Sequence, residues 1–215
     1  MNNSVPIFGT FPGYLEGTPA TGITVNLIYD YLCPDSRNQN SIIEELMTTE
    51  FLDGTVQDYI QFTYTTFPLP YHIHAYQVNQ LVPFFMDLCI ESNASCFNDT
   101  YRDFAFAQQD TILGMKDTSQ NDFIDWWSGQ VASELNLEKS LVQSAYTSSE
   151  YSTDSSQRDF LKYAWAAGVS GTASAFVNSV KLDSPPTSVD AWISLLNSVY
   201  ASQYKYVHKR SSFLA

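Results

Sequence analysis

The chain has few cysteines and few basic residues. Of its 215 residues, three are cysteine, and ten are lysine or arginine against 23 that are aspartate or glutamate. The resulting formal charge of −13 repels nucleic acid and anionic lipid surfaces, so we expect neither as a partner. The charge does not exclude a protein partner or client, and a basic protein would complement it. The sequence does not specify an oligomeric state.

Long hydrophobic runs are also missing. No stretch reaches the roughly 18 apolar residues of a membrane-spanning helix, and the first nine residues lack the basic start and apolar run of a signal peptide. We therefore expect no membrane span in the chain as given. Its content of 44% hydrophobic and 15% aromatic residues instead predicts a folded, globular protein.

Two of the three cysteines lie close together. A short polar loop separates Cys89 from Cys96, and Asn93 and Asn98 begin Asn-x-Ser/Thr glycosylation sequences there. A disulfide in this loop would contribute about 2 to 3 kcal/mol and would persist only in an oxidising compartment. We therefore predict a disulfide and a glycoprotein of the secretory pathway or the extracellular space. The alternative is an apolar Cys89 and an ordinary loop thiol at Cys96.

The third cysteine follows a predicted strand. Residues 23–30 are apolar, and Cys33 and Pro34 come just before a polar segment that predicts a helix to about residue 50. A cysteine ahead of a helix faces unpaired N–H groups and the positive end of the helix dipole, which favour a thiolate. Asp35 opposes this effect from the same turn. Because Ser36 occupies the fourth position, the motif has no second thiol for a two-thiol exchange cycle.

The rest of the chain predicts an ordered series of elements. Residues 56–66 form a β-branched and aromatic run, so strand, helix and strand open a parallel βαβ unit. A hairpin near residues 174–178 and a closing helix after two prolines follow a long helical stretch. We divide the chain into an N-terminal extension (1–22), a sheet-containing domain (23–70 and 155–204), a helical insertion (71–154) and a C-terminal tail (205–215).

Together these features resemble a known family. A strand leading to Cys33-Pro34, a strand ending in Leu-Pro-Tyr-His72, a helical insertion, and Gly-Val-Ser-Gly-Thr172 followed by Phe-Val-Asn178 are similar to the DsbA-like branch of the thioredoxin fold. The resemblance covers residues 20–204. It implies an α/β, thioredoxin-like fold with a central mixed sheet of four or five strands, helices on both faces, and a large helical insertion covering the Cys33 end.

The sequence differs from this family at two positions of the active site. Ser36 replaces the second cysteine, and Ala173 stands where the family has a proline whose cis bond shapes the wall opposite the thiol. A cis bond before alanine costs about 2.5 to 4 kcal/mol, so we predict a trans bond between Thr172 and Ala173 and a remodelled loop. Losing both features argues against a general dithiol oxidant.

Two hypotheses follow for function. In the first, the active site is degenerate and the protein binds a partner or serves in an assembly. In the second, Cys33 is the nucleophile of a monothiol oxidoreductase or a glutathione-handling enzyme, and Ser36 donates a hydrogen bond to its thiolate. Glutathione would then be a substrate, and no resident cofactor is expected. Candidate substrate-binding residues are Tyr31, Pro34, Asp35, Thr172 and Ala173, with Asp30 as a further contact.

We predict no metal site. His72 and His74 are two residues apart where a helix begins, so their side chains diverge, and the sequence offers no third ligand. A zinc site at Cys89 and Cys96 lacks a second pair of ligands. His72 is instead expected to pack or cap where the helical insertion leaves the sheet.

Overall fold

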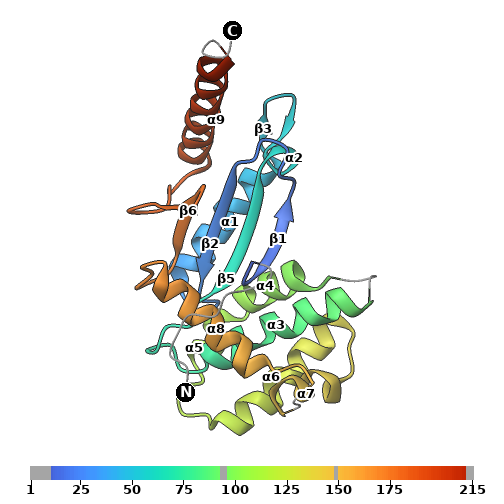
Figure 1. Cartoon of the computed structure of the whole chain (residues 1–215). Helices are drawn as coiled ribbons and strands as arrows, with labels where there is room; N and C mark the ends of the chain where they lie inside the picture. The colour runs from blue at the N-terminus through green and yellow to red at the C-terminus, as the bar shows by residue number, and fades with distance from the viewer. Residues whose placement is uncertain (1–10, 93–95, 148–149, 212–215) are drawn as a thin grey trace. The chain divides into compact units, whose positions relative to one another are not determined.

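The structure is a computed structural model that describes residues 11–92, 96–147 and 150–211 (Figure 1). Its main sheet is mixed and has five strands in the order β1-β5-β2-β6-β7. The predicted α/β class with a central mixed sheet and a large helical insertion is confirmed. The strands are β1 (Tyr14–Gly17), β2 (Thr24–Tyr29), β5 (Gln61–Thr66), β6 (Ser174–Val177) and β7 (Val180–Lys181).

The chain forms two compact units. Of the described residues, unit 1 contains those within 11–14, 28–37 and 64–174, and unit 2 contains those within 15–27, 38–63 and 175–211. The boundary between the units passes through β2 and β5, whereas the domains predicted from the sequence keep each strand whole. Those domain limits therefore stay a prediction.

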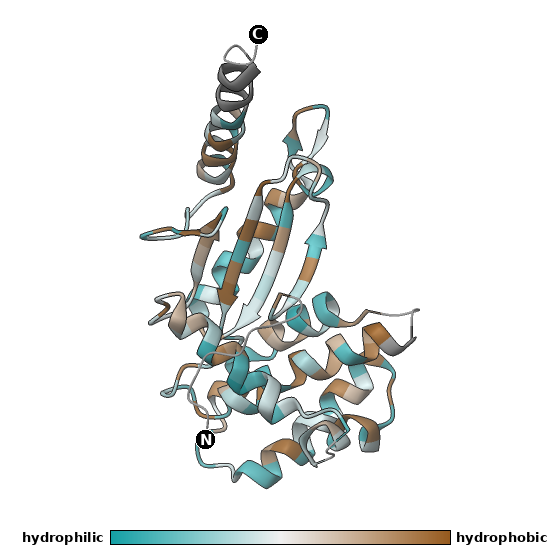
Figure 2. Ribbon diagram, in the orientation of Figure 1, coloured by the Kyte–Doolittle hydropathy of each residue, from teal (hydrophilic) through white to brown (hydrophobic). Residues whose placement is uncertain are grey.

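Unit 2 contains most of the sheet. Figure 2 shows the hydrophobic colour concentrated along β2, whose Val25 and Leu27 are buried, while β5 is mostly neutral to hydrophilic. Its other elements are most of α1 (Pro34–Thr48), the hairpin of β3 (Glu50–Phe51) and β4 (Gly54–Thr55), α2 (Val56–Tyr59) and α9 (Val189–Ser211). The ring of Tyr200 on α9 meets Phe51 edge to face, with the centroids 6.1 Å apart.

One sequence prediction in this region is wrong. Residues 56–66 are not one strand, because Asp58 accepts hydrogen bonds from the backbone N and the hydroxyl of Thr55, at 2.8 and 2.7 Å. This N-terminal cap starts the short helix α2, and β5 begins only at Gln61. The extension predicted for residues 1–22 contains the edge strand β1, which is short and ends at Gly17. Such a short strand carries too little alternation to be recognised.

Unit 1 is dominated by helices, which gather as a bundle in Figure 1. Its core is aromatic and includes the fully buried Phe84, Phe85, Tyr101, Phe123 and Trp127. The helices are α3 (Ala75–Ser92), α4 (Asn98–Ala107), α5 (Gln109–Leu113), α6 (Gln120–Leu135), α7 (Lys139–Thr147) and α8 (Thr153–Ala166).

A disulfide joins the end of α3 to the segment before α4. It links Cys89 to Cys96, as predicted, with 4.5 Å between the Cα atoms. The bond therefore closes the connection between two neighbouring helices of unit 1. None of the helices in the described part of the chain combines the length and hydropathy that a bilayer-spanning helix needs.

Candidate functional site

Cys33 lies in unit 1, between the end of β2 and the first turn of α1. The backbone N of Arg37 donates to the Cys33 carbonyl at 3.1 Å, so Cys33 caps the helix as the sequence predicts. Its side chain is covered: the residue is 5% exposed, and Sγ donates to the carbonyl of Thr172 at 3.3 Å. Two segments 139 residues apart thus meet at the thiol, while Pro34 and Asp35 beside it are exposed.

The hydroxyl of Ser36 contacts the backbone of Asp30 and not the Cys33 thiol. It is fully buried, and its Oγ accepts a hydrogen bond from the backbone N of Asp30 at 3.2 Å. Between Ser36 and Cys33 the described structure contains no side-chain hydrogen bond. The predicted hydrogen bond from Ser36 to the sulfur is therefore not among the described contacts, in which the Ser36 oxygen accepts from the backbone of the preceding loop.

The loop opposite Cys33 contains a cis peptide bond between Thr172 and Ala173. The prediction of a trans bond is wrong, since it used only the local cost of the cis form and not the contacts around the loop. Ser174 Oγ donates to the Gly171 carbonyl at 2.8 Å, and the Thr172 carbonyl accepts from Cys33. Thr172 and Ala173 are partly exposed and remain candidates for contact with a ligand.

Asp30 is the polar centre of this region, and sequence reasoning gave it only a minor role. Its side chain is fully buried, and its two carboxylate oxygens receive four hydrogen bonds. Oδ1 accepts from the backbone N of Leu32 and from Nδ2 of Asn79, each at 2.9 Å. Oδ2 accepts from the backbone N of Leu69 at 3.1 Å and lies 2.6 Å from Nδ1 of His72.

The histidines therefore have structural partners. His72 contacts Asp30, and His74 is buried, with its ring stacked on Phe123 at 4.0 Å and Nε2 3.1 Å from the Met115 carbonyl. In the part of the chain that the structure describes, no three Cys, His, Asp or Glu side chains are placed to hold a metal ion.

Tyr31, a predicted ligand contact, points into the interior of unit 1. Its hydroxyl lies 3.2 Å from that of Tyr14, and burial raises the pKa of Tyr31 well above its ordinary value. The backbone of Tyr31 is also held, because its N donates to Oδ1 of Asn79 at 3.3 Å and its carbonyl accepts from Nε2 of Gln109 at 3.1 Å. Tyr31 therefore fixes the backbone next to Cys33 through contacts in the interior of unit 1.

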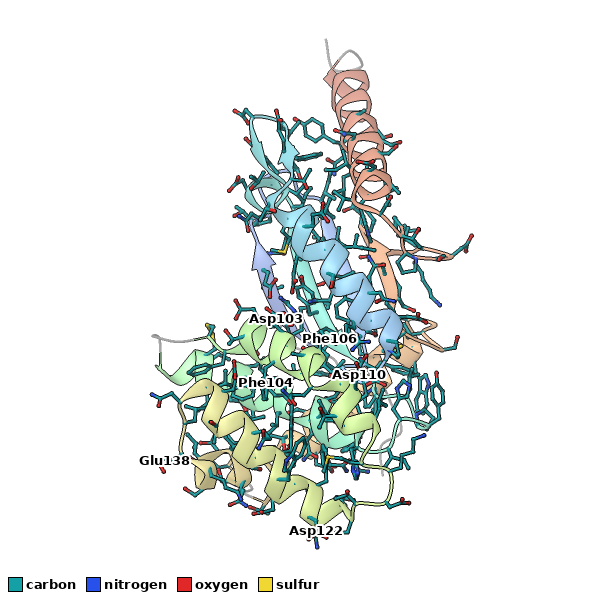
Figure 3. The ribbon with its side chains drawn as sticks, turned by 180° about the vertical axis from the view of Figure 1, so that it is seen from behind. Asp103, Phe104, Phe106, Asp110, Asp122 and Glu138 are labelled. Atoms are coloured by element: carbon teal, nitrogen blue, oxygen red, sulfur yellow. A yellow bond between two sulfur atoms is a disulfide. The ribbon has the colours of Figure 1, made fainter. Side chains whose placement is uncertain are left out.

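Figure 3 labels two acidic residues of unit 1, Asp103 on α4 and Asp110 on α5. Asp110 pairs with Arg37 of α1 at 3.2 Å, near the surface. Arg102 is almost fully buried: its guanidinium lies 4.7 Å from the centre of the Tyr64 ring, and Nε contacts Asp103 at 3.2 Å. These basic groups are bound to neighbours of their own unit.

The two glycosylation sequences differ in what the structure describes. Asn93 lies outside the described residues. Asn98 is the first residue of α4 and is only 8% exposed. An attached glycan needs an accessible side chain, so this burial does not favour Asn98, and both sites stay predictions.

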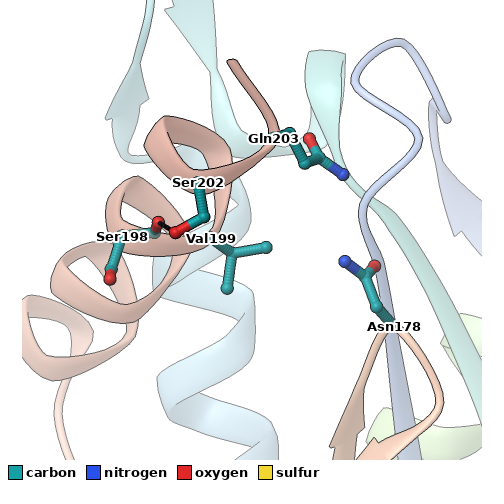
Figure 4. A pocket seen from close by; sticks show the side chains of 5 residues that line it. All are labelled: Asn178, Ser198, Val199, Ser202 and Gln203. Carbon is teal, nitrogen blue, oxygen red and sulfur yellow. Dashed lines mark hydrogen bonds between the residues drawn. The ribbon is translucent and has the colours of Figure 1, made fainter. Parts of the chain in front are cut away.

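A separate pocket lies in unit 2, between α9 and the turn after β6 (Figure 4). Of the five residues that line it, four have an uncharged polar side chain and one is a valine. Asn178 uses its Oδ1 to accept from the backbone N of Thr24 at 3.0 Å, and Ser202 donates to the Ser198 carbonyl at 2.8 Å. The lining residues are Asn178, Ser198, Val199, Ser202 and Gln203. None of these five residues carries an acidic, basic or thiol side chain.

No protein-family model and no curated protein sequence matches the chain. Solved structures do match. Wolbachia pipientis α-DsbA1 has a TM-score of 0.62 at 13% identity, over 94% of this chain and 96% of that one. BdbD from Bacillus subtilis in its oxidised form has a TM-score of 0.58 at 15% identity, over 88% and 94%. A thioredoxin-like oxidoreductase from Silicibacter pomeroyi has a TM-score of 0.59 at 15% identity, over 91% and 94%. The chain therefore has the fold of the DsbA-like branch of the thioredoxin proteins.

Proposed function

We propose that this protein is a noncatalytic, DsbA-like scaffold that binds a protein partner. The observation that carries the proposal is the state of Cys33, which is the one cysteine outside the disulfide and is covered by the Thr172 carbonyl. A dithiol oxidant needs a second thiol to resolve its mixed disulfide, and Ser36 cannot supply one. A thiol that solvent barely reaches also exchanges slowly.

Exposed apolar side chains offer a surface for such a partner. In unit 1, Tyr71 is 70% exposed, Trp165 is 66% exposed, and Ile73 is exposed as well. The ring of Trp165 is anchored edge to face on Phe67, with 6.1 Å between the centroids. Exposed aromatic residues of this kind are enriched in protein interfaces. The net charge of −13 favours a basic partner.

An oxidising compartment agrees with this proposal. The Cys89–Cys96 disulfide is of the kind that persists in secreted proteins and is reduced in the cytosol. We therefore include the secretory pathway or the extracellular space in the proposal, with glycosylation at Asn93 or Asn98 as a feature still to be measured.

The test is the alkylation rate of Cys33 in the native protein between pH 4 and 9. The disulfide keeps the other two cysteines out of the reaction, so no cysteine needs to be replaced. We expect native Cys33 to react about a hundredfold more slowly than Cys33 in urea. The matched control is Asp35→Cys in a Cys33→Ser background, which places a thiol at an exposed position of the same turn. Native Cys33 reacting as fast as this control would overturn the proposal.

A monothiol enzyme is the second candidate, and the position of Cys33 at the N-terminus of α1 favours it. In this reaction the Cys33 thiolate attacks oxidised glutathione, the glutathione disulfide breaks, and one glutathione leaves as a thiolate while the other stays bound to Cys33. A client thiolate then attacks the glutathione sulfur of this mixed disulfide, so that Cys33 leaves as a thiolate and the client carries the glutathione in a new disulfide. Mass spectrometry after mixing native protein with oxidised glutathione decides between the two candidates, because the scaffold stays unmodified.

A further inference from the structure

The carboxylate of Asp30 joins three separate segments of unit 1. Its hydrogen bonds come from its own loop, through Leu32, from the segment after β5, through Leu69 and His72, and from α3, through Asn79. A carboxylate is buried at great cost unless donors satisfy both oxygens. Here each oxygen receives two donors, so the three segments have to stay together for Asp30 to remain buried.

The backbone of Asp30 also holds both sides of Cys33. The Asp30 carbonyl accepts from the backbone N of Cys33 at 2.9 Å, and its N donates to Ser36 Oγ at 3.2 Å. The residue that links the three segments therefore also fixes the turn that carries the thiol. Any movement that exposes Cys33 by shifting this turn has to move Asp30 and disturb its carboxylate contacts.

We propose that Asp30, His72 and Asn79 form a lock that holds the Cys33 turn in place, with its thiol against the Thr172 carbonyl. They are positioning residues: none contacts the sulfur through a described hydrogen bond, and they act through the backbone of residues 30–36. The inference rests on the covered Cys33 of the proposed function. It adds that access to the thiol is controlled by the contacts of one carboxylate and not by the exposed residues Pro34 and Asp35.

His72 is the part of the lock nearest to solvent, with 14% of its side chain exposed. It reaches Asp30 through Nδ1, and the amide nitrogen of an asparagine lies the same number of bonds from the backbone as this atom. His72→Asn therefore keeps a donor for Asp30, whereas His72→Ala removes it. A purely structural loss of the imidazole would affect both variants alike.

Helix α3 supplies a matched pair of variants. Asn79 and Gln80 are neighbouring buried amides, but Asn79 donates to Asp30 and Gln80 donates to Thr153 Oγ1 at 2.9 Å. Asn79→Ala removes both the donor to Asp30 and the acceptor for the Tyr31 backbone N, whereas Gln80→Ala removes a buried hydrogen bond elsewhere in unit 1. Both lose a buried amide from the same helix, but Asn79 makes more hydrogen bonds, so the stability of each variant is measured in urea and the rates are compared at equal stability.

The experiment measures Cys33 alkylation and amide hydrogen exchange of residues 30–36 in the native protein. We expect both rates to rise about ten- to a hundredfold in His72→Ala and Asn79→Ala, and to stay within about threefold of wild type in His72→Asn and Gln80→Ala. Equal rates in Asn79→Ala and Gln80→Ala, or no rescue by His72→Asn, would overturn the lock. If His72→Ala does not fold, the pair on α3 decides.

The two readouts separate this inference from the proposed function. Amide exchange reports opening of the turn whether or not the thiol is reactive. Fast alkylation of the wild type together with raised exchange in the lock variants would refute the noncatalytic scaffold and keep the lock. Slow alkylation of the wild type with unchanged amide exchange in every variant would refute the lock and keep the noncatalytic scaffold.

Discussion

At the scale of single residues, the site is organised by buried polar groups and not by the thiol. The thiol of Cys33 makes one described hydrogen bond, to the Thr172 carbonyl, while Asp30 and Ser36 are fully buried and hydrogen-bonded. At the position where a dithiol enzyme has its resolving cysteine, this chain has a serine that accepts a hydrogen bond from the backbone. Ser36 belongs to the structure of the turn in this chain.

Replacing Ser36 with alanine tests this role. The change leaves the buried N–H of Asp30 without its partner, so we expect the free energy of unfolding to fall by about 1 to 3 kcal/mol. Ser128 is the control, because it is equally buried and its Oγ has no hydrogen-bond partner among the described residues. Ser128→Ala should change stability by less than about 0.5 kcal/mol. Equal losses in equilibrium urea unfolding would contradict the assignment.

The sequence identified some of these residues and missed others for physical reasons. Cys33, Ser36 and Thr172 belong to short motifs, so they could be found without knowing the fold. The lock could not, because Asn79 lies 49 positions after Asp30 in the sequence and meets it only in the folded chain. The sequence shows Asp30 only as a single aspartate after a strand, and many loops contain such a residue. The cis bond at Ala173 was missed because local cost was weighed without the surrounding contacts.

At the scale of elements, α6 and α7 are joined at the surface by one carboxylate. Lys139 Nζ lies 2.7 Å from Asp125 Oδ1, and Gln143 donates to the same oxygen at 2.9 Å. The hydrogen bond from Lys139 is the main cause that lowers the pKa of Asp125. Because a lowered carboxyl pKa favours the folded state, this contact stabilises the two helices above the ordinary pKa and is lost as the pH falls through the lowered value.

Lys139→Met should therefore raise the pKa of Asp125 toward its ordinary value, followed by the carboxyl carbon signal in an NMR titration. Both side chains are largely exposed, so the loss in stability should be small. Lys162→Met is the matched control, since Lys162 pairs with Asp159 on α8 at 2.9 Å. A shift of Asp125 in this control, or none in Lys139→Met, would show that Lys139 is not the cause.

Helices were easier to predict than short strands. The helical insertion is long and its apolar residues recur with the helical period over many turns, so its helices were recognised. Strand β1 has four residues and β3, β4 and β7 have two each, which is too short for a period of two to be seen. Their pairing comes from the neighbouring strands, as in the register of Phe176 with Lys181.

At the scale of the whole molecule, charge is the property that most restricts the partner. The formal net charge of −13 comes from a chain with ten basic residues, and several of these are already paired with carboxylates. A duplex DNA probe should therefore not bind even at about 50 mM salt, where electrostatic attraction is only weakly screened. A lysine-rich peptide should bind weakly there and dissociate at about 0.5 M salt.

Fluorescence anisotropy with the two labelled probes makes this comparison, and a peptide with glutamate at each lysine position is the control. The attraction of the lysine-rich peptide should fall as salt rises, because it depends on the summed charge and not on one pocket. Peptide binding that is indifferent to salt would point to the exposed Tyr71 and Trp165 as the main contact. Retention of DNA at moderate salt would contradict the exclusion of nucleic acid, because a binding surface of opposite sign would then have to exist on this acidic chain.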